Sequence, residues 1–436
     1  MTTTARSVPV RHSTASAPRR LSPTVAFYLQ ASIVVTFLAG SSAPTPLYAV
    51  YQDEWGFTPI TTTVVFGVYA VAVLVALLIA GSLSDHVGRR PVLIAAIGVQ
   101  AATMVLFATA GGVPELLLAR VIQGLATGSA VGALGAGMLD LNKARGTLAN
   151  AVAPMTGTAV GAIASGLLVQ FLPAPTRLVY LALLVVLGLQ LVGVVLMPES
   201  SGRRAGALRS LRPRFALPAH VRRPFLLAAP ALVAVWALAG FYASIGPALV
   251  RVVVGNSSLV LAGLGLFILA GTGSVTVVLL RNTPSRGVMV IGAVALLLGV
   301  GLTLPAIVMP AGAQLALVAF FIGTIVAGVG FGAGFQGAIR TVMPLAAPHE
   351  RSGVLSVMYV VSYLALGVPA VVAGFLVVDG GGILTTAREY AVAVMALAVL
   401  ALLGPAVQAW QSRRQPAAAR AMPVNPCGQP ALPEMS

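Results

Sequence analysis

The chain has 436 residues, of which 58% are hydrophobic and only 8% are charged, and its mean hydropathy is +0.97. An ordinary soluble domain carries about 25% charged residues, so this composition excludes a water-soluble surface. The abundance of apolar side chains excludes a disordered chain, and long unbroken apolar runs argue against a membrane β-barrel, which would show short alternating segments. The sequence therefore predicts an all-α membrane protein that crosses the bilayer many times.

The chain begins with a polar segment, residues 1–22, which we expect to be a cytosolic tail because no short apolar core with a cleavage site follows it. Twelve apolar runs come next, each long enough for a spanning helix of about 20 residues. They lie near residues 24–46, 59–82, 91–110, 115–138, 149–171, 176–197, 224–248, 257–280, 287–309, 313–338, 354–378 and 388–410. The final polar segment contains the only cysteine, Cys427, which excludes an intramolecular disulfide.

The net charge of +16 arises from 26 Lys and Arg residues against 10 Asp and Glu residues. Such a positive net charge has two possible explanations: nucleic-acid binding, or the excess of basic residues in the cytoplasmic loops of membrane proteins. Nearly all the basic residues fall in alternate segments between the runs, with no folded domain to carry them, so the sequence predicts no nucleic-acid partner and places both termini in the cytosol. The single lysine, Lys143, beside many arginines is typical of a GC-rich bacterial genome, and we expect a bacterial cytoplasmic membrane.

An arginine-rich segment divides the twelve runs into two groups of six. We expect an N-terminal bundle over 23–197, a basic cytosolic linker over 198–223, a C-terminal bundle over 224–410 and a cytosolic tail over 411–436. The halves also repeat weakly, because Gly124 and Gly128 in the fourth run correspond to Gly328 and Gly332 in the tenth. Duplicated six-helix halves are a known plan of transporters; chance similarity between glycine-rich helices is the alternative.

The segment between the second and third runs carries the most specific motif. Its first glycine lets a helix approach closely, its aspartate can cap a helix N-terminus, and its second glycine permits a tight turn. The segment resembles the helix 2–3 loop motif of the major facilitator superfamily, G-x-L-a-D-r-x-G-r-k-x-x-l, at Gly81, Leu83, Asp85, Gly88, Arg89, Arg90 and Leu93. The resemblance implies a conformational gate that latches the N-terminal half against the eleventh helix. A plain positive-inside turn is the alternative.

The fourth run contains Arg120, Gln123 and Gly124, which resemble the superfamily's helix-four motif R-x-x-q-G. An arginine inside an apolar run is costly and indicates a functional site. The residue three positions further on shares its helix face, so we expect both side chains to face the bundle interior. The resemblance implies a role in proton coupling, while outward snorkelling or a purely structural role is the alternative reading.

The fifth run contains the spaced glycines Gly157, Gly161 and Gly166. They resemble the antiporter motif of the superfamily, roughly G-x-x-x-G-P-x-x-G-G, although Ala162 stands in place of its proline and Ser165 in place of a glycine. The resemblance implies antiport. The alternative is that these glycines only allow close packing of helices.

Polar and aromatic residues inside the runs are the candidates for substrate contact. They are Gln30 and Phe37 in the first run, Trp236 and Tyr242 in the seventh, and Gln336 in the tenth. Together they predict a cavity that is apolar with hydrogen-bonding amides, which suits a lipophilic or neutral small molecule. The prolines at 44 and 46 are expected to break the first helix near the outer gate.

Acidic residues are nearly absent from the apolar runs. The titratable candidates for proton coupling are Asp85, Asp140, Asp53 and Glu54. We expect the first two to form ion pairs at the inner gate with Arg89, Arg90 or Lys143, and the last two to be solvated loop acids. The lack of embedded acids leaves the proton-carrying residue unassigned.

The motifs together identify the chain as resembling the bacterial twelve-helix efflux members of the superfamily. The resemblance implies a secondary transporter that exports a drug or metabolite by alternating access, with the proton as coupling ion and no enzymatic activity. A sugar or metabolite porter of the same fold, including an importer, is the alternative, and a membrane protein that does not transport is a more distant one. We expect a monomer in the lipid bilayer, with no cofactor and no metal.

Overall fold

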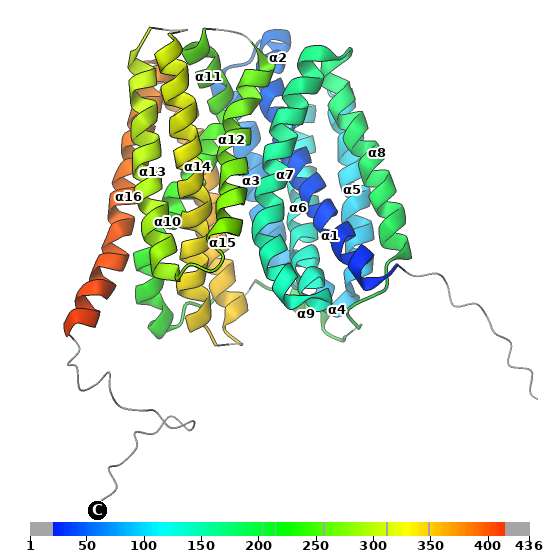
Figure 1. The fold of residues 1–436 in the computed structure, drawn as a ribbon. Coiled ribbons are helices and arrows are strands. Elements are labelled where there is room, and N and C mark those ends of the chain that lie inside the picture. The colour runs from blue at the N-terminus through cyan, green and yellow to red at the C-terminus, as the bar shows by residue number, and fades with distance from the viewer. Residues whose placement is uncertain are drawn as a thin grey trace, which may run out of the picture.

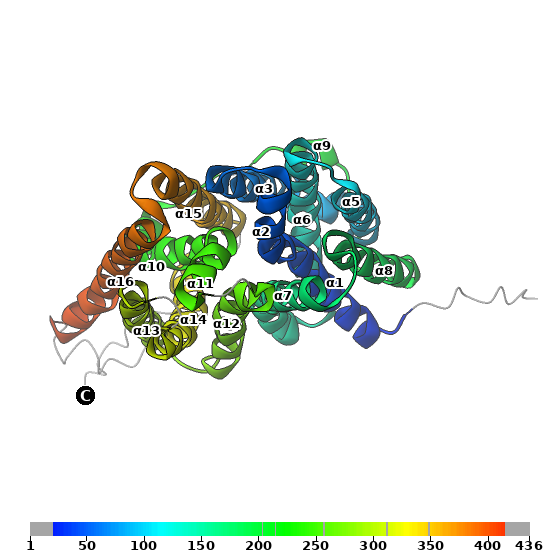
Figure 2. The same cartoon turned by 90° about the horizontal axis from the view of Figure 1, so that it is seen from above.

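The computed structural model describes residues 21–414 except 203, 214, 256–257, 311–312 and 348, so the outer parts of both predicted tails lie outside the described residues. Within this part the elements are helices, with no strand (Figure 1). Twelve helices are long and apolar enough to cross a membrane, which confirms the predicted all-α fold. They form two bundles of six that lie side by side when viewed from above (Figure 2).

The N-terminal bundle contains α1 (Pro23–Ser42) with α2 (Pro44–Trp55), α3 (Pro59–Ala80), α5 (Arg89–Thr109), α6 (Val113–Leu141), α7 (Lys143–Phe171) and α8 (Pro175–Leu196). The C-terminal bundle contains α10 (Ala219–Ser244) with α11 (Gly246–Val254), α12 (Leu259–Leu279), α13 (Ser285–Val308), α14 (Gln314–Val342), α15 (Arg351–Asp379) and α16 (Gly382–Arg414). The short helices are α4 (Ser84–Val87), α9 (Ala207–Ser210) and η1 (Met343–Leu345). Several spans begin at a proline, which lacks the amide hydrogen that a first turn leaves unbonded.

The molecule has two ends, which we call the linker face and the opposite face. The linker face carries α4 and α9, and the chain enters α1 and leaves α16 on that side (Figure 1). The opposite face carries α2 and α11. The described part of the segment predicted as a linker, 198–223, is therefore in contact with the bundles, since Arg204 donates its amide to the carbonyl of His86 at 2.8 Å.

Two helix pairs join the halves, α7 with α12 and α3 with α15. Small residues allow these approaches. A Cβ on Gly263 of α12 would lie 2.5 Å from the carbonyl oxygen of Ala162 in α7, and a Cβ on Gly367 of α15 would lie 3.4 Å from the Cβ of Ala70 in α3. Glycine at helix crossings lets two backbones come together in lipid, where close packing drives association.

The first helix of each half is kinked at a corresponding place. In the N-terminal half α1 gives way to α2 at Ala43, next to the two predicted helix-breaking prolines. In the C-terminal half α10 gives way to α11 at Ile245, next to Pro247. A proline removes one backbone hydrogen bond, so each kink leaves carbonyl oxygens inside the bundle that need other donors.

Candidate transport site and gate

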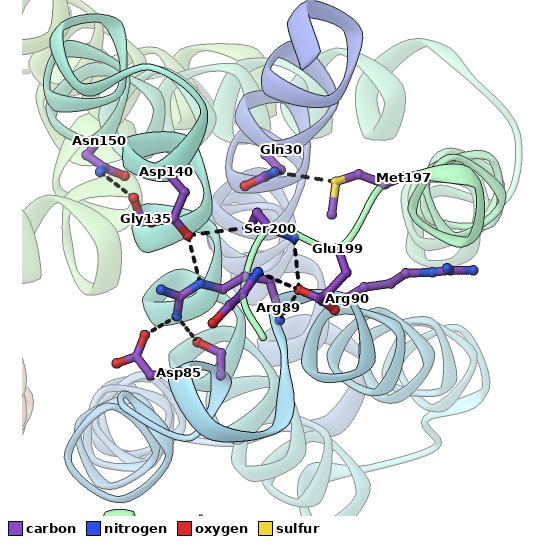
Figure 3. A network of polar contacts seen from close by, with 12 residues as sticks. Gln30, Asp85, Arg89, Arg90, Gly135, Asp140, Asn150, Met197, Glu199 and Ser200 are labelled. Atoms are coloured by element: carbon purple, nitrogen blue, oxygen red, sulfur yellow. Dashed lines mark hydrogen bonds and ion pairs between the residues drawn. The ribbon is translucent and has the colours of Figure 1, made fainter. Parts of the chain in front are cut away.

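At the linker face, the gate motif gathers around the side chain of Arg89 (Figure 3). This side chain is almost fully buried at the start of α5. Its guanidinium forms an ion pair with Asp85 of α4, donates to Oδ2 of Asp140 in α6 at 3.2 Å, and donates to Oγ of Ser84 at 2.6 Å. The predicted ion pairs of Asp85 and Asp140 with an arginine of this loop are therefore confirmed, and they tie three helices of one half together.

Glu199, which the sequence analysis did not single out, completes this network (Figure 3). Its carboxylate accepts from the backbone amides of Arg89 at 2.8 Å and Arg90 at 3.0 Å. The carboxylate thus caps the N-terminus of α5, where unbonded amides and the helix dipole favour an anion. It also accepts from the amide of Ser200 at 3.1 Å, so the start of the linker is fixed to the gate.

The glycines of the motif have the conformations that their predicted roles require. Gly88 has φ = +107°, a region that favours glycine, and a Cβ there would lie 2.8 Å from Oε2 of Glu199. Gly81 lies against Gly132 of α6, where a Cβ would lie 3.1 Å from the Gly81 carbonyl oxygen. Leu83 packs against the apolar interior of the N-terminal half, whereas the side chain of Arg90 extends away from the network (Figure 3). The latch on the eleventh helix stays a prediction.

Nearer the opposite face, Arg120 of α6 is fully buried, as the sequence analysis expected. Its Nη1 donates to Oε1 of Gln123 at 2.7 Å and to the carbonyl of Ser41 at 2.9 Å, and its Nε donates to the hydroxyl of Tyr48 at 3.1 Å. The guanidinium carbon lies 5.2 to 5.7 Å from the ring centroids of Tyr69, Tyr48 and Phe107. None of the ion pairs formed by the described residues includes it. Hydrogen bonds and ring faces therefore compensate a buried charge that lacks an acidic partner.

Side chains from α6 and α7 satisfy the backbone at the first kink. Pro44 lacks the amide hydrogen that would bond to the carbonyl of Gly40, and Nε2 of Gln123 donates to that oxygen at 3.0 Å. Oγ of Ser165 donates to the carbonyl of Ala43 at 2.6 Å. The serine that departs from the superfamily pattern in the fifth run thus supports the kink in the first.

The second kink uses a donor from the other half. Pro247 leaves the carbonyl of Ala243 without its helical donor, and Oγ1 of Thr45 in α2 donates to it at 3.2 Å. This hydrogen bond links the halves on the side of the opposite face. Within the C-terminal half, the hydroxyls of Tyr242 and Thr324 are 2.8 Å apart, and Thr324 occupies the place in α14 that Arg120 occupies in α6 by the glycine correspondence.

In the C-terminal half, aromatic side chains from α10, α14 and α15 meet, and Tyr363 among them also packs against the α3 cluster of Tyr69, Val73 and Leu77. The ring of Trp236 lies 5.5 Å from that of Phe335 and 5.6 Å from that of Tyr363. The indole Nε1 of Trp236 is buried and has no hydrogen-bond partner among the described residues, and Oε1 of Gln336 is in the same condition. A buried donor and a buried acceptor are thus left unused in this conformation.

The model of the Major Facilitator Superfamily matches residues 31–368, which is most of the chain. The chain belongs to this superfamily. It is therefore a multi-pass membrane transporter of two six-helix halves. The crystal structure of a mutant of the nucleoside transporter NupG has the same fold, with a TM-score of 0.64 at 12% identity, covering 90% of this chain and 100% of that chain. No curated protein matches the sequence.

In this superfamily member, the other predicted residues lie inside one half or the other. Gln30 is buried, and its Nε2 donates to the sulfur of Met197 at 3.4 Å. Phe37 belongs to the apolar interior of the N-terminal half. Nε2 of Gln336 donates to the carbonyl of Val277 in α12 at 3.3 Å. Substrate contact by these residues stays a prediction.

The fifth-run glycines lie at helix crossings. A Cβ on Gly157 would lie 2.9 Å from Leu38 of α1, and one on Gly161 would overlap the backbone of the same helix at Ala39. A Cβ on Gly166 would lie 2.8 Å from the carbonyl oxygen of Leu259, at the start of α12 in the other half. The geometry agrees with the packing interpretation, and the antiport interpretation remains open.

Pro247 is the signal that could have located the second kink from sequence, because a proline cannot donate to the helix ladder. Nothing comparable marked Glu199 as a cap, because its partners lie more than 100 positions away in the chain. In the described part of the chain, no three His, Cys, Asp or Glu side chains lie close enough to hold a metal.

Proposed function

We propose that this transporter exports a small, neutral or apolar organic molecule by proton antiport, through alternating access of its two halves. The observation that carries the substrate class is the aromatic group of Trp236, Phe335 and Tyr363 in the C-terminal half, whose Tyr363 reaches α3 of the other half, with the unpaired indole N–H of Trp236 among them. Such a group offers apolar area, ring faces and one hydrogen-bond donor. A dianionic substrate would require several basic side chains there.

The resemblance of two helix motifs supports export coupled to protons. These are Arg120 with its neighbours in α6 and the spaced glycines of α7. The linker face fits the cytosolic side, because it carries the ion pairs of Arg89 and the arginine-rich linker. We place the protein as a monomer in a bacterial cytoplasmic membrane, with both termini in the cytosol.

An importer of a sugar or another metabolite is the second candidate. The likeness of the fold to NupG, a nucleoside transporter, favours it in one respect, since ring faces and a hydrogen-bond donor also suit a flat heterocycle. Direction and coupling separate the two candidates. Uptake of the substrate without substrate-induced proton movement would contradict the antiport proposal and support the importer.

The test combines a resistance screen of a deletion strain against a compound panel with transport in proteoliposomes that carry a pH gradient. For a substrate found in the screen, Trp236→Phe keeps an aromatic ring but removes the N–H. One hydrogen bond is worth about 1 kcal/mol, so we expect KM to rise about fivefold. The matched control is Trp55→Phe, at the end of α2, where the indole stacks on Tyr51 at 4.5 Å. An unchanged KM in Trp236→Phe would contradict the proposed site.

The single cysteine tests the orientation. Because Cys427 is the only thiol in the chain, an impermeant maleimide should label the protein only after the cells are permeabilised. Labelling in intact cells would place the C-terminal tail outside and overturn the proposed topology.

A further inference from the structure

A small cavity lies between the two halves on the side of the opposite face, away from the aromatic group. Its volume is about 40 Å³, and α2, α3, α11, α15 and α16 all contribute to its wall. The polar side chains of its wall include those of Thr62 in α3, Arg251 in α11 and Tyr48 in α2. Cavities that hold whole organic ligands are roughly 300 Å³ or larger, so this one has room only for a small group.

Two polar side chains of the wall are unused. Thr62 is only 6% exposed, and its hydroxyl has no hydrogen-bond partner among the described residues. Nε of Arg251 is also buried without an acceptor. Buried donors are nearly always paired in native proteins, so two unpaired donors in the wall of one cavity indicate an absent acceptor.

The positive charge of the wall comes from the arginine rather than from helix ends. Pro59, Pro247 and Ile383 belong to the first turns of α3, α11 and α16, whereas Gln52, Ser244 and Val377 belong to the last turns of α2, α10 and α15. The partial charges of helix N-termini and C-termini are opposite in sign, so they offset one another around the cavity. Tyr48, another wall residue, accepts hydrogen bonds from the buried Arg120, which adds a second guanidinium behind the wall.

No acid balances this charge within the wall. The lining contains one arginine and no aspartate or glutamate. The nearest acids in sequence to the lining residues, Asp53, Glu54, Asp379 and Glu389, are all exposed. A guanidinium and an unpaired hydroxyl in a wall without a carboxylate form a donor set that recognises an anion.

We propose that this cavity, which we name the anion cavity, binds one monovalent anionic group, either a free halide or the carboxylate of a small organic acid. The ion would contact residues of both halves, Thr62 on one side and Arg251 on the other, so it would favour the arrangement in which the opposite face is closed. The proposal concerns binding, and it holds whether the transporter exports or imports its substrate.

The experiment measures thermal unfolding of the full-length protein in nanodiscs by tryptophan fluorescence. Sodium chloride is titrated against sodium gluconate at constant ionic strength, because gluconate is too large for the cavity. We expect a saturable rise in the unfolding midpoint with chloride. Sodium acetate in a parallel titration distinguishes the two sources: a response to chloride but not acetate assigns a halide site, and the reverse assigns a carboxylate site.

Two variants and one control connect the response to the cavity. Arg251→Gln should weaken the apparent affinity at least about tenfold, because it removes a charge-assisted hydrogen bond. Thr62→Val, which keeps the side-chain shape, should weaken it about threefold to tenfold and serves if the first variant fails to fold. The control Arg177→Gln removes an exposed arginine on the same face, at the start of α8, and should respond like the wild type. The absence of a response to both anions in the wild type, or a wild-type response in both cavity variants, would overturn the proposal.

Discussion

Gly124 lies where α6 crosses α3, and its replacement by alanine tests how closely these two helices must approach. A Cβ at this position would lie 2.6 Å from the Cβ of Ala72, 2.8 Å from the carbonyl oxygen of Tyr69 and 3.0 Å from the amide of Val73. All three atoms are backbone or Cβ atoms, so no side-chain rotation can make room. Carbon atoms pack at about 3.5 to 4.0 Å, so α3 must withdraw by about 1 Å.

Overpacking of this kind costs about 1–3 kcal/mol, partly offset by the better helix propensity of alanine, which contributes up to about 1 kcal/mol. We therefore expect Gly124→Ala to destabilise the protein by about 1–2 kcal/mol. Thermal unfolding in nanodiscs measures this as a midpoint lowered by a few degrees. Transport should fall as well, because the same helix turn carries Gln123, which donates to the carbonyl at the first kink.

The matched control is Gly98→Ala in α5, where a Cβ would meet nothing within 4 Å. The chemical change and the helical setting are the same, so only the close contact differs. The control should unfold at the wild-type temperature or slightly above it. If the two variants unfold at the same temperature, the close approach of α3 and α6 at Gly124 does not constrain the fold, and the reasoning is wrong.

Three further predictions concern the gates. Asp85→Asn should abolish transport in proteoliposomes while leaving expression normal, because Arg89 keeps its second carboxylate partner but α4 loses its ion pair; normal transport would reduce the loop to a topological signal. Thr45→Val removes the donor to the carbonyl of Ala243, so the ratio of separated to joined molecules should rise about fivefold in the distribution of spin-label distances between α2 and α11. An unchanged distribution would exclude a latch there. Glu199→Gln should accelerate hydrogen exchange of the first α5 amides severalfold, and equal exchange would contradict the cap.

Much of the gate was predictable because its parts are close in the sequence. A tight turn at Gly88 and an ion pair between Asp85 and Arg89 could be predicted, since these residues lie within five positions of one another. The burial of Arg120 was expected as well, because an arginine inside an apolar run is costly to expose to lipid. The kink at Ala43 followed from prolines that cannot donate to the helix ladder.

The contacts across long sequence separations could not be predicted in the same way. Gln30 and Phe37 are residue types that often line a cavity, yet both pack within the N-terminal half in the structure. The reason is that the face a helix turns inward depends on which neighbours surround it. An amphipathic pattern that would fix this orientation in water is absent when a helix is apolar on all sides. The pairing of Thr45 with Ala243 depends likewise on how the two halves meet.

The sequence by itself determined the twelve spans, the two halves and the superfamily, because hydropathy, charge placement and local motifs depend on neighbours along the chain. Only the tertiary structure decided that Glu199 caps α5 and that Gln123 and Ser165 satisfy the first kink. It also gathered Thr62 and Arg251 around one cavity. Hydrogen-bond donors and acceptors buried in a bilayer must be paired inside the protein, and only the packing of distant helices determines which groups are available to pair.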